Sequence, residues 1–468
     1  MSRKFQCKAI SSAWLENNGR RLDCGPYMSG AIEARELLKK HRTERLQDLT
    51  LERNGGIFNG PRFPRVYVDN PANGVPFLGS TDILHADLTV TSLLSKRQVA
   101  NIPALILDEG WTLITCSGTI GRMAYARPDM KGMVGSQHFM RIAPDRYRVK
   151  SGYLYSYLCS RFGVPIVVEG TYGAIIQHIE PHHIADLPVP RLGDIEEKAH
   201  QFVEKAASLL GEYQKKINES TRLYFDSVGL LNVTPYEWHS WGSDLGFATT
   251  VGVHSLRAVN FNPRFNRLCE RIKQGHWKPL SELCVPGTLK RGGRFSRIDA
   301  DPEYAYRLIG QKELFRLRPD GRWIAKKSVP NDVLVKEGSI LIAARGTLGE
   351  SELYCRAEFI HGKSVENAYS EDILRVIGDE SVIERGALFA FMRSETAFRM
   401  LRSISVGSKL QDHHYAMLPS LPIPYPPEDI RSHCHQLITE AYAAREKAIE
   451  LEDEARTLVE RAIEEGGR

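Results

Sequence analysis

Residues 107–121 read LDEGWTLITCSGTIG, and residues 335–349 read VKEGSILIAARGTLG. Both stretches place a Glu-Gly pair before a β-rich hydrophobic run, and both end in Gly-Thr-Ile/Leu-Gly at a constant offset of 228 residues (349 − 121). Self-similarity at a fixed offset is typical of a duplicated structural unit. The sequence therefore predicts two copies of one module.

A proline-punctuated exit and a long helical pattern follow each copy. The exits read LPVP at residues 187–190 and LPIP at residues 421–424. The helical patterns run from about residue 194 to 228 and from about residue 428 to 464, with apolar residues at steps of three and four. Both are longer than the typical globular helix of about 11–12 residues. Because a narrow apolar stripe needs a partner, we predict that the helices pair as an antiparallel coiled coil. The alternative is that each packs on its own module.

The chain therefore divides into four segments. They are a first module at residues 1–192, a central helix at 193–230, a second module at 231–427 and a C-terminal helix at 428–468. Within the modules, short β-rich runs broken by Gly and Pro alternate with helical patches. We predict a mixed α/β (α+β) fold with two tandem domains, separated and followed by long helices.

The composition is that of an ordinary globular protein. The 468 residues are 42% hydrophobic and 25% charged, and the net charge of +5 permits a nucleic-acid partner without requiring one. Eight cysteines without a Cys-x-x-Cys pair predict reduced thiols, rather than disulfides or a zinc site. No apolar run approaches the roughly 18 residues of a membrane span, and the first residues lack the apolar run of a signal peptide. We expect a cytoplasmic protein with no membrane partner.

Three short motifs suggest catalysis, and each is incomplete. Gly362-Lys363-Ser364 resembles the end of a phosphate-binding loop, but the required earlier glycine is Ala357. Residues 262–265, NPRF, resemble the Asn-Pro-Pro-aromatic loop of adenine methyltransferases, without the second proline or a Gly-rich cofactor loop. Residues 128–131, PDMK, are a fragment of a nuclease signature that no Glu-x-Lys pair follows. We therefore expect no catalytic residues in this chain.

Histidines gather at residues 182–183, 413–414 and 433–435. The last group lies on a predicted helix, where neighbours two residues apart point in different directions. We interpret these histidines as surface or core residues rather than as metal ligands.

Basic and amide side chains near the duplicated motif are the candidates for DNA binding. Lys and Arg supply charge for phosphates, and Arg and Gln are suited to guanine and adenine edges. In the first module the candidates are Arg122, Arg127, Lys131, Gln137 and Arg141. In the second module they are Lys290, Arg291, Arg294, Arg297 and Arg345.

The glycine motif itself is interpreted as structural. It consists of Gly118, Thr119 and Gly121 in the first copy and of Gly346, Thr347 and Gly349 in the second. We expect Gly121 and Gly349 to permit a tight turn or a positive φ rather than to touch DNA. Thr119 and Thr347 fit either a turn or a phosphate contact.

The ordered set of motifs, present twice, resembles the specificity (S) subunits of type I restriction-modification systems. After the Gly-Thr-x-Gly motif, the first copy continues with Gly173, Gln177 and the exit that ends at Pro190. The second continues with Gly407, Gln411 and the exit that ends at Pro424. Each motif alone is weak, but the resemblance covers nearly the whole chain.

The resemblance implies two target-recognition domains, each contacting one half of a bipartite site in double-stranded DNA, with the paired helices as a spacer. It also implies a chain without cofactor or metal of its own. Adenine-N6 methyltransferase subunits would carry S-adenosylmethionine, and a restriction/translocase subunit would use ATP and Mg²⁺. The exits here continue with residues 196–198, EEK, and 428–430, EDI, where the family often has Glu-Gln. This departure is compatible with a relative in a methylation-associated phage-defence system.

Two other hypotheses remain open from the residues alone. One is a stand-alone DNA methyltransferase or nuclease that uses residues 262–265 or 128–131. The other is a scaffold whose helices join other proteins and whose modules do not bind DNA.

Overall fold

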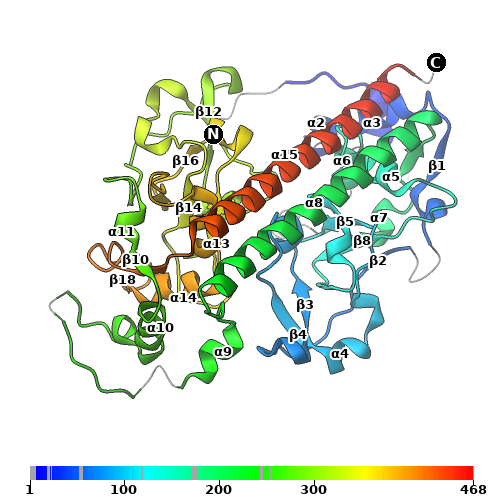
Figure 1. Ribbon diagram of the computed structural model, residues 1–468. Helices are drawn as coiled ribbons and strands as arrows, with labels where there is room; N and C mark the ends of the chain where they lie inside the picture. The colour runs from blue at the N-terminus through cyan, green and yellow to red at the C-terminus, as the bar shows by residue number, and fades with distance from the viewer. Residues whose placement is uncertain are drawn as a thin grey trace. The chain divides into compact units, whose positions relative to one another are not determined.

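The computed structural model describes residues 7–17, 20, 22, 24–51, 56–117, 120–169, 178–242, 246–252 and 254–466 (Figure 1). Its contacts divide the chain into two compact units. Unit 1 comprises residues 1–211 and 447–468, and unit 2 comprises residues 212–446. Each unit therefore contains one module together with half of each long helix, α8 (Asp194–Ser227) and α15 (Glu428–Glu464).

The described residues of unit 1 contain three small sheets. The four-stranded sheet is antiparallel and has the order β2 (Ile57–Asn59), β8 (Phe139–Ile142), β5 (Thr112–Thr115), β6 (Met123–Tyr125). The three-stranded sheet has the order β4 (Ser92–Ser95), β3 (Gly74–Leu78), β7 (Val134–Gly135), with β3 and β7 parallel. The third sheet pairs β1 (Thr43–Arg45) with β9 (Pro188–Pro190), so the proline-rich exit is itself a strand.

Unit 2 repeats these sheets. The four-stranded order is β11 (Lys290–Arg291), β17 (Ile373–Val376), β14 (Ile340–Ala343), β15 (Ala357–Phe359). The three-stranded order is β13 (Arg322–Ala325), β12 (Ala305–Ile309), β16 (Ala368–Tyr369), again with one parallel pair. The exit strand β20 (Pro422–Pro424) pairs with β10 (Trp277–Pro279), and a further hairpin joins β18 (Ser405–Val406) and β19 (Asp412–His413). The predicted duplication is confirmed at the level of strand order and direction.

Short helices complete each unit. In unit 1 these are α1 (Ser12–Asn17), α2 (Gly25–Met28), α3 (Ala31–Leu38), α4 (Lys96–Ala100), α5 (Ser151–Leu158), α6 (Gly163–Glu169) and α7 (Pro181–Ile184). In unit 2 they are α9 (Pro235–Ser240), α10 (Pro263–Lys273), α11 (Leu280–Leu283), α12 (Gln311–Leu314), α13 (Arg385–Met392) and α14 (Glu395–Ser403). The predicted mixed α/β fold is confirmed.

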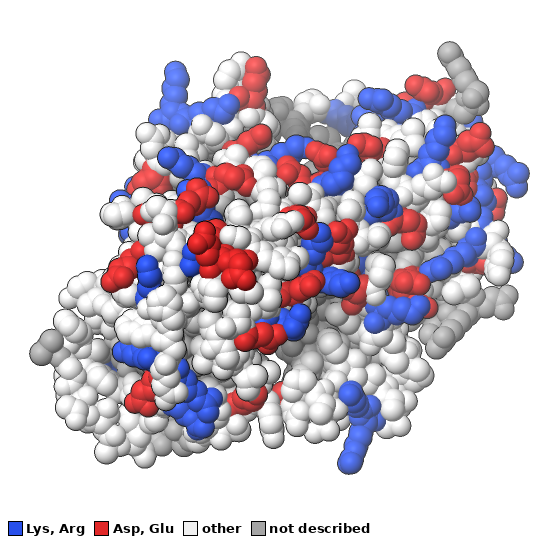
Figure 2. All heavy atoms as spheres, in the orientation of Figure 1, with Lys and Arg blue, Asp and Glu red and all other residues white. Residues whose placement is uncertain are grey.

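The two long helices run antiparallel. In unit 1, Ala199 and Val203 of α8 share a hydrophobic core with Val459 and Ile463 of α15. In unit 2, the Lys216 ammonium lies 2.5 Å from a carboxylate oxygen of Glu440, and the Ser220 hydroxyl donates to the main-chain carbonyl of Cys434 at 3.1 Å. As residue numbers increase along α8, the numbers of their partners in α15 decrease, so the helices are antiparallel and the predicted pairing is confirmed. Acidic and basic side chains are interspersed over the two helices on the face in Figure 2.

The same glycine–histidine contact joins each long helix to its module. In unit 1, the amide of Gly152 in α5 donates to Nδ1 of His200 in α8 at 3.2 Å. In unit 2, the amide of Gly386 in α13 donates to Nδ1 of His435 in α15 at 3.1 Å. A Cβ on either glycine would lie within 3 Å of the facing helix, so only glycine permits this close approach. The long helices therefore pack both on each other and on the modules.

Candidate nucleic-acid interface

The duplicated motif begins where the central strand pair of each four-stranded sheet ends. The last residue pairs are Thr115 with Phe139 in unit 1 and Ala343 with Ile373 in unit 2. Beyond them the Cys116 amide donates to the carbonyl of residue 138 at 3.1 Å, and the Ala344 amide donates to that of residue 372 at 2.9 Å. The residues that leave one strand are thereby held against the residues that enter the other.

Four polar side chains meet at this strand end in each unit, and we name each group a strand-end cluster. The cluster of unit 1 consists of Arg65, Ser117, Gln137 and His138. The cluster of unit 2 consists of Arg297, Arg345, Glu371 and Asp372. In both, one arginine comes from the segment between the second and third strands of the module, β2 and β3 or β11 and β12.

Hydrogen bonds connect all four members of the unit 1 cluster. An Nη of Arg65 donates to Oε1 of Gln137 at 3.0 Å, and Nε2 of Gln137 lies 3.2 Å from Nε2 of His138. Nδ1 of that imidazole lies 3.1 Å from the hydroxyl of Ser117. Burial, together with the charges of Arg65, His178 and Arg62, lowers the pKa of His138. A neutral imidazole has one donor and one acceptor nitrogen, as base-edge recognition requires.

Ion pairs take the same places in the unit 2 cluster. Arg297 donates to a carboxylate oxygen of Glu371 at 2.6 Å, and Nε of Arg345 lies 3.5 Å from a carboxylate oxygen of Asp372. Burial acts to raise the pKa of Glu371, but a hydrogen bond from its own main chain and the charges of Arg297 and Arg294 bring it below its ordinary value. Glu371 is therefore ionised at neutral pH.

Two further residues of unit 2, Asp412 and Gln311, hold Arg291 and Arg345 in place at the cluster. Asp412 of β19 forms an ion pair with Arg291 at 2.9 Å, and its carboxylate lies 4.0 Å from the guanidinium of Arg345. The side-chain amide of Gln311 holds both the main-chain amide and the carbonyl of Arg345 at 2.9 Å. Arg345 is thus fixed at its backbone, while its guanidinium lies between two carboxylates.

The glycine and glutamine of the repeated pattern meet in unit 2. The Gln411 amide donates to the Gly346 carbonyl at 2.8 Å, although 65 residues separate them (411 − 346). This contact brings the two motifs of the second copy together. In unit 1, Ser117 and His178 form the neighbouring bridge, whereas Gly118, Thr119, Gly173 and Gln177 lie outside the described residues.

The sequence predicts a DNA contact for Arg141, but its side chain is fully buried, with 0% exposure. Its guanidinium donates to the carbonyl oxygens of Gly135, Ser136 and Phe139 at 2.6 to 3.1 Å. These carbonyls bracket Gln137 and His138. Arg141 therefore does not reach a phosphate, and it fixes the segment that carries two members of the cluster. Burial lowers its pKa to about 10.

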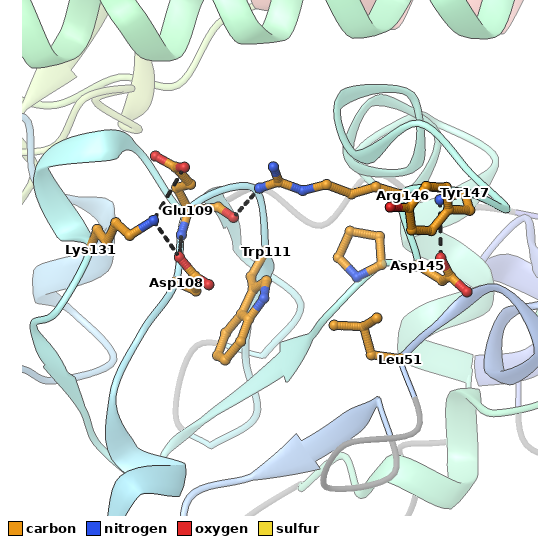
Figure 3. A pocket seen from close by; sticks show the side chains of 9 residues that line it. Leu51, Asp108, Glu109, Trp111, Lys131, Asp145, Arg146 and Tyr147 are labelled. Carbon is orange, nitrogen blue, oxygen red and sulfur yellow. Dashed lines mark hydrogen bonds and ion pairs between the residues drawn. The ribbon is translucent and has the colours of Figure 1, made fainter.

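Arg127 and Lys131 also differ from the expectation. Arg127 is 3% exposed and bound to Asp129 at 2.7 Å, so its charge is neutralised inside the fold. Lys131 is exposed but pairs with Asp108 at 3.2 Å and Glu109 at 3.3 Å, at the rim of a hollow that also contains Trp111 (Figure 3). Those acids precede β5, so Lys131 lies at the opposite end of that strand from the cluster.

The other residues predicted to bind DNA remain accessible. Arg122, Lys290, Arg294 and Arg297 are exposed, and Gln137, Arg291 and Arg345 are half-buried. The Arg122 main chain pairs with Thr115, which places it at the same strand end as the unit 1 cluster.

The motif glycines differ between the copies. Gly121 has a φ of 78°, and a Cβ there would lie 2.5 Å from Val168, so the expected positive φ is confirmed. Gly349 has no positive φ, and a Cβ would meet only the Glu352 side chain at 3.1 Å. Its carbonyl accepts from the Glu352 amide at 3.0 Å, so in the second copy the glycine begins a tight turn without needing a positive φ. Gly346 is half-buried in its bridge to Gln411, and Thr347 is exposed.

The incomplete catalytic motifs have structural roles. Amides of Gly362 and Lys363 donate to the carboxylates of Glu337 and Glu446 at 3.0 Å, so acids occupy the donors that a phosphate would need. Asn262 caps α10 by accepting from the Arg264 amide at 2.9 Å. Residues 128–130 form a 3-10 turn, in which the carboxylate of Asp129 binds Arg127.

The histidine groups likewise have identifiable packing partners. His183 accepts from the Glu180 amide at 3.1 Å, and His414 lies 2.9 Å from the His254 carbonyl. His413 is buried against Cys355, and burial lowers its pKa to about 3. Among the described residues, no cluster of three or more His, Cys, Asp or Glu side chains is arranged to hold a metal ion, and no helix has the length and apolarity to cross a membrane.

Several cluster members escape prediction from the sequence. Arg65, Ser117, Glu371 and Asp372 belong to none of the motifs, nor does Asp412 beside them, and acids are not an obvious feature of a DNA interface. The available signal is register, because residues 117 and 345 share the motif's offset of 228 and residues 137–138 and 371–372 share the exit's offset of 234.

Comparison with solved structures matches nearly the whole chain to specificity subunits. The type I restriction-modification S subunit from M. genitalium covers 91% of this chain and 95% of its own, at 12% identity and a TM-score of 0.32. The HsdS subunit from Thermoanaerobacter tengcongensis covers 90% and 96%, at 14% identity and a TM-score of 0.26. The chain is similar to type I specificity subunits. A third matching chain, from a structure on complex assembly and conformational transition of the type I restriction-modification system, covers 91% and 97% at 14% identity and a TM-score of 0.26. No protein-family model and no curated protein matches.

Proposed function

We propose that this chain is the DNA sequence-recognition subunit of a type I-like restriction-modification or methylation-linked defence complex. Each unit would contact one half of a bipartite target in double-stranded DNA. The observation that carries the proposal is the strand-end cluster, because a polar and basic group of side chains recurs at the same place in both units. Duplication of the fold accounts for two binding sites, and different side chains in the clusters account for two different half-sites.

The chemistry of the clusters supports DNA as the ligand. Arginine forks match guanine edges and phosphates, and glutamine matches the adenine edge. Exposed Arg122 lies at the strand end of unit 1, and exposed Arg294 lies close enough to the cluster of unit 2 to act on Glu371, so both can supply charge for phosphate contacts. Exposed Lys290 lies in β11, the strand beside β17. Arg141 and Arg375 do not contact DNA in this proposal, because each is bonded to the loop that carries two cluster members and holds that loop in place.

The catalytic work belongs, in this proposal, to partner subunits. Adenine-N6 methyltransferase subunits carry S-adenosylmethionine, and a restriction/translocase subunit, where one is attached, uses ATP and Mg²⁺. The antiparallel helices α8 and α15 set the spacing between the half-sites and offer the docking surface. The full-length chain incubated alone with DNA and either S-adenosylmethionine or Mg²⁺ is expected to give no methylated or cleaved product; product formation would instead favour the stand-alone enzyme.

Selection from a randomised duplex library tests the proposal. The full-length chain, together with the subunits that co-purify from its own operon, is incubated with the library, and bound DNA is sequenced. We expect enrichment of a split motif with a fixed gap, and binding that weakens steeply with salt. Retention of DNA without any enriched sequence, at every salt concentration, would overturn the proposed function.

A further inference from the structure

The two strand-end clusters are equivalent position by position. Residues 117 and 345 each lie directly before the Gly-Thr-x-Gly motif, at an offset of 228. Residues 137–138 and 371–372 precede β8 and β17 at an offset of 234. Arg65 and Arg297 each donate to the residue at the first of these paired positions, Gln137 or Glu371. The frame is thus shared, and differences between the units lie in the side chains it carries.

The shared frame is enforced by a buried arginine in each unit. Arg141 donates to carbonyls of residues 135, 136 and 139, and Arg375 donates to carbonyls of residues 369, 370 and 373. Gly60 and Gly292 leave room for these guanidinium groups, since a Cβ there would lie 3.2 and 2.7 Å from them. The two intervening residues are therefore presented from a loop of the same shape.

The side chains on this frame have different hydrogen-bonding chemistry. Unit 1 presents the amide of Gln137 and the imidazole of His138, which are neutral groups that both donate and accept. Unit 2 presents the carboxylates of Glu371 and Asp372, which only accept, each beside an arginine that only donates.

In the major groove a C·G pair offers the cytosine N4 amino donor next to the guanine O6 and N7 acceptors, and an A·T pair offers the adenine N6 donor and N7 acceptor. An acid beside an arginine complements the first pattern, and an amide complements the second.

We propose that positions 137–138 and 371–372 determine sequence specificity, with unit 2 selecting a G·C pair and unit 1 an A·T pair in their respective half-sites. The inference rests on the proposed function and deepens it. The arginine partners, Arg65, Arg297 and Arg345, orient these side chains and contribute donors to the same base pair.

Transplanting the residues of one unit into the other tests the inference. The double variant Glu371→Gln/Asp372→His gives unit 2 the side chains of unit 1, and Gln137→Glu/His138→Asp makes the reverse change. Each is compared with the wild-type chain in the library selection, in complex with its co-purifying subunits. We expect each variant to lose its G·C or A·T preference by on the order of tenfold at one position in one half-site, with the other half-site unchanged.

A control variant separates recognition from net charge. Glu282→Gln/Glu303→Gln removes the same two negative charges from exposed positions of unit 2 and is expected to keep the wild-type motif. The single variant Glu371→Gln, which is isosteric, serves if the double variant melts early. Transplants that fold and still enrich the wild-type motif would overturn the inference and leave the proposed function standing. A wild-type chain that enriches nothing would overturn both.

Discussion

Arg141 and Arg375 donate to carbonyl oxygens at the same three sequence offsets, two, five and six residues earlier in the chain. Each guanidinium is buried, and burial lowers the pKa of both side chains to about 10. A buried cation bonded only to carbonyl dipoles is costly, so a packed hydrophobe would be cheaper for stability alone. We interpret both arginines as positioning residues that shape the loops carrying the strand-end clusters.

Replacement of Arg375 by lysine tests this role. Lysine retains the charge but lacks the planar fork, so carbonyls of residues 369, 370 and 373 cannot all be satisfied. Each buried carbonyl left without a donor costs about 1–3 kcal/mol. We expect a lower melting temperature in thermal unfolding and a blurred preference in one half-site only. Wild-type melting together with a wild-type motif would contradict the positioning role.

The glycines where the short helices cross the long ones give a stability prediction with a matched control. In Gly152→Ala, the new Cβ lies 2.8 Å from Val203 Cβ and 2.9 Å from the His200 carbonyl, so α5 and α8 must separate. Overpacking of this kind costs roughly 1–3 kcal/mol. Gly211 lies within α8 and its Cβ meets open space among the described residues, so Gly211→Ala should stabilise by up to about 1 kcal/mol. Chemical denaturation measures both, and equal effects would contradict the close crossing.

Buried His413 predicts a pH dependence. Burial, and to a lesser extent Arg291, lowers its pKa from 6.5 to about 3, and its ring contacts Cys355 and Tyr354. Between these values the unfolded chain binds the proton and the folded chain does not. The contribution of His413 to stability is therefore lost as the pH falls from 6.5 toward 3, by up to about 1.4 kcal/mol per pH unit.

Comparison with a variant isolates this histidine from other titrating groups. The stability difference between the wild type and His413→Gln should shrink as the pH falls, because glutamine takes up no proton. His433→Gln, at an exposed position of α15, should keep the wild-type slope. Parallel stability curves for the wild type and His413→Gln across this range would show that His413 is protonated in the folded state.

The repeat and the long helices could be predicted because they leave periodic signals. The Gly-Thr-x-Gly offset indicates the two modules, and the apolar stripes indicate α8 and α15 with their pairing. The side chains proposed to face DNA could not be predicted as well, because charge does not reveal burial. Arg141 and Arg127 look like surface cations in the sequence, yet one binds carbonyls and the other binds Asp129.

The glycine repeat shows a related limit. The glycines of the two Glu-Gly pairs, Gly110 and Gly338, have positive φ angles of 83° and 75°. The first glycine of the repeated stretch is therefore the one that the turn requires in both copies. Gly121 and Gly349 hold equal places in the sequence and differ in conformation. The repeated glycines in the sequence therefore located the right loop but did not show which glycine has a backbone conformation that requires glycine.

Substituting alanine for Gly121 and for Gly349 tests this difference between the two copies. Gly121→Ala places a Cβ in left-handed backbone and against Val168, so we expect a clear loss of stability of unit 1, on the order of 1–3 kcal/mol. Gly349→Ala requires only a small movement of the Glu352 side chain and should be close to neutral. Thermal melts of the two variants decide this, and a destabilised Gly349→Ala chain beside an unaffected Gly121→Ala chain would reverse the assignment.

Charge reversal in unit 2 tests whether the modules bind DNA at all, against the scaffold hypothesis. Arg291 and Arg294 lie beside the cluster, and their replacement by glutamate puts negative charge where phosphates are expected. Removing one phosphate-binding cation should reduce the slope of log affinity against log salt by about 0.9.

Lys131→Glu is the control, because Lys131 lies at the far end of β5 and already pairs with two acids. We expect the double variant Arg291→Glu/Arg294→Glu to bind at least tenfold more weakly with a shallower slope, and Lys131→Glu to bind nearly as the wild type does. Unchanged DNA binding by the double variant within the assembled complex would favour the scaffold, since the face that carries the cluster would then not meet the duplex.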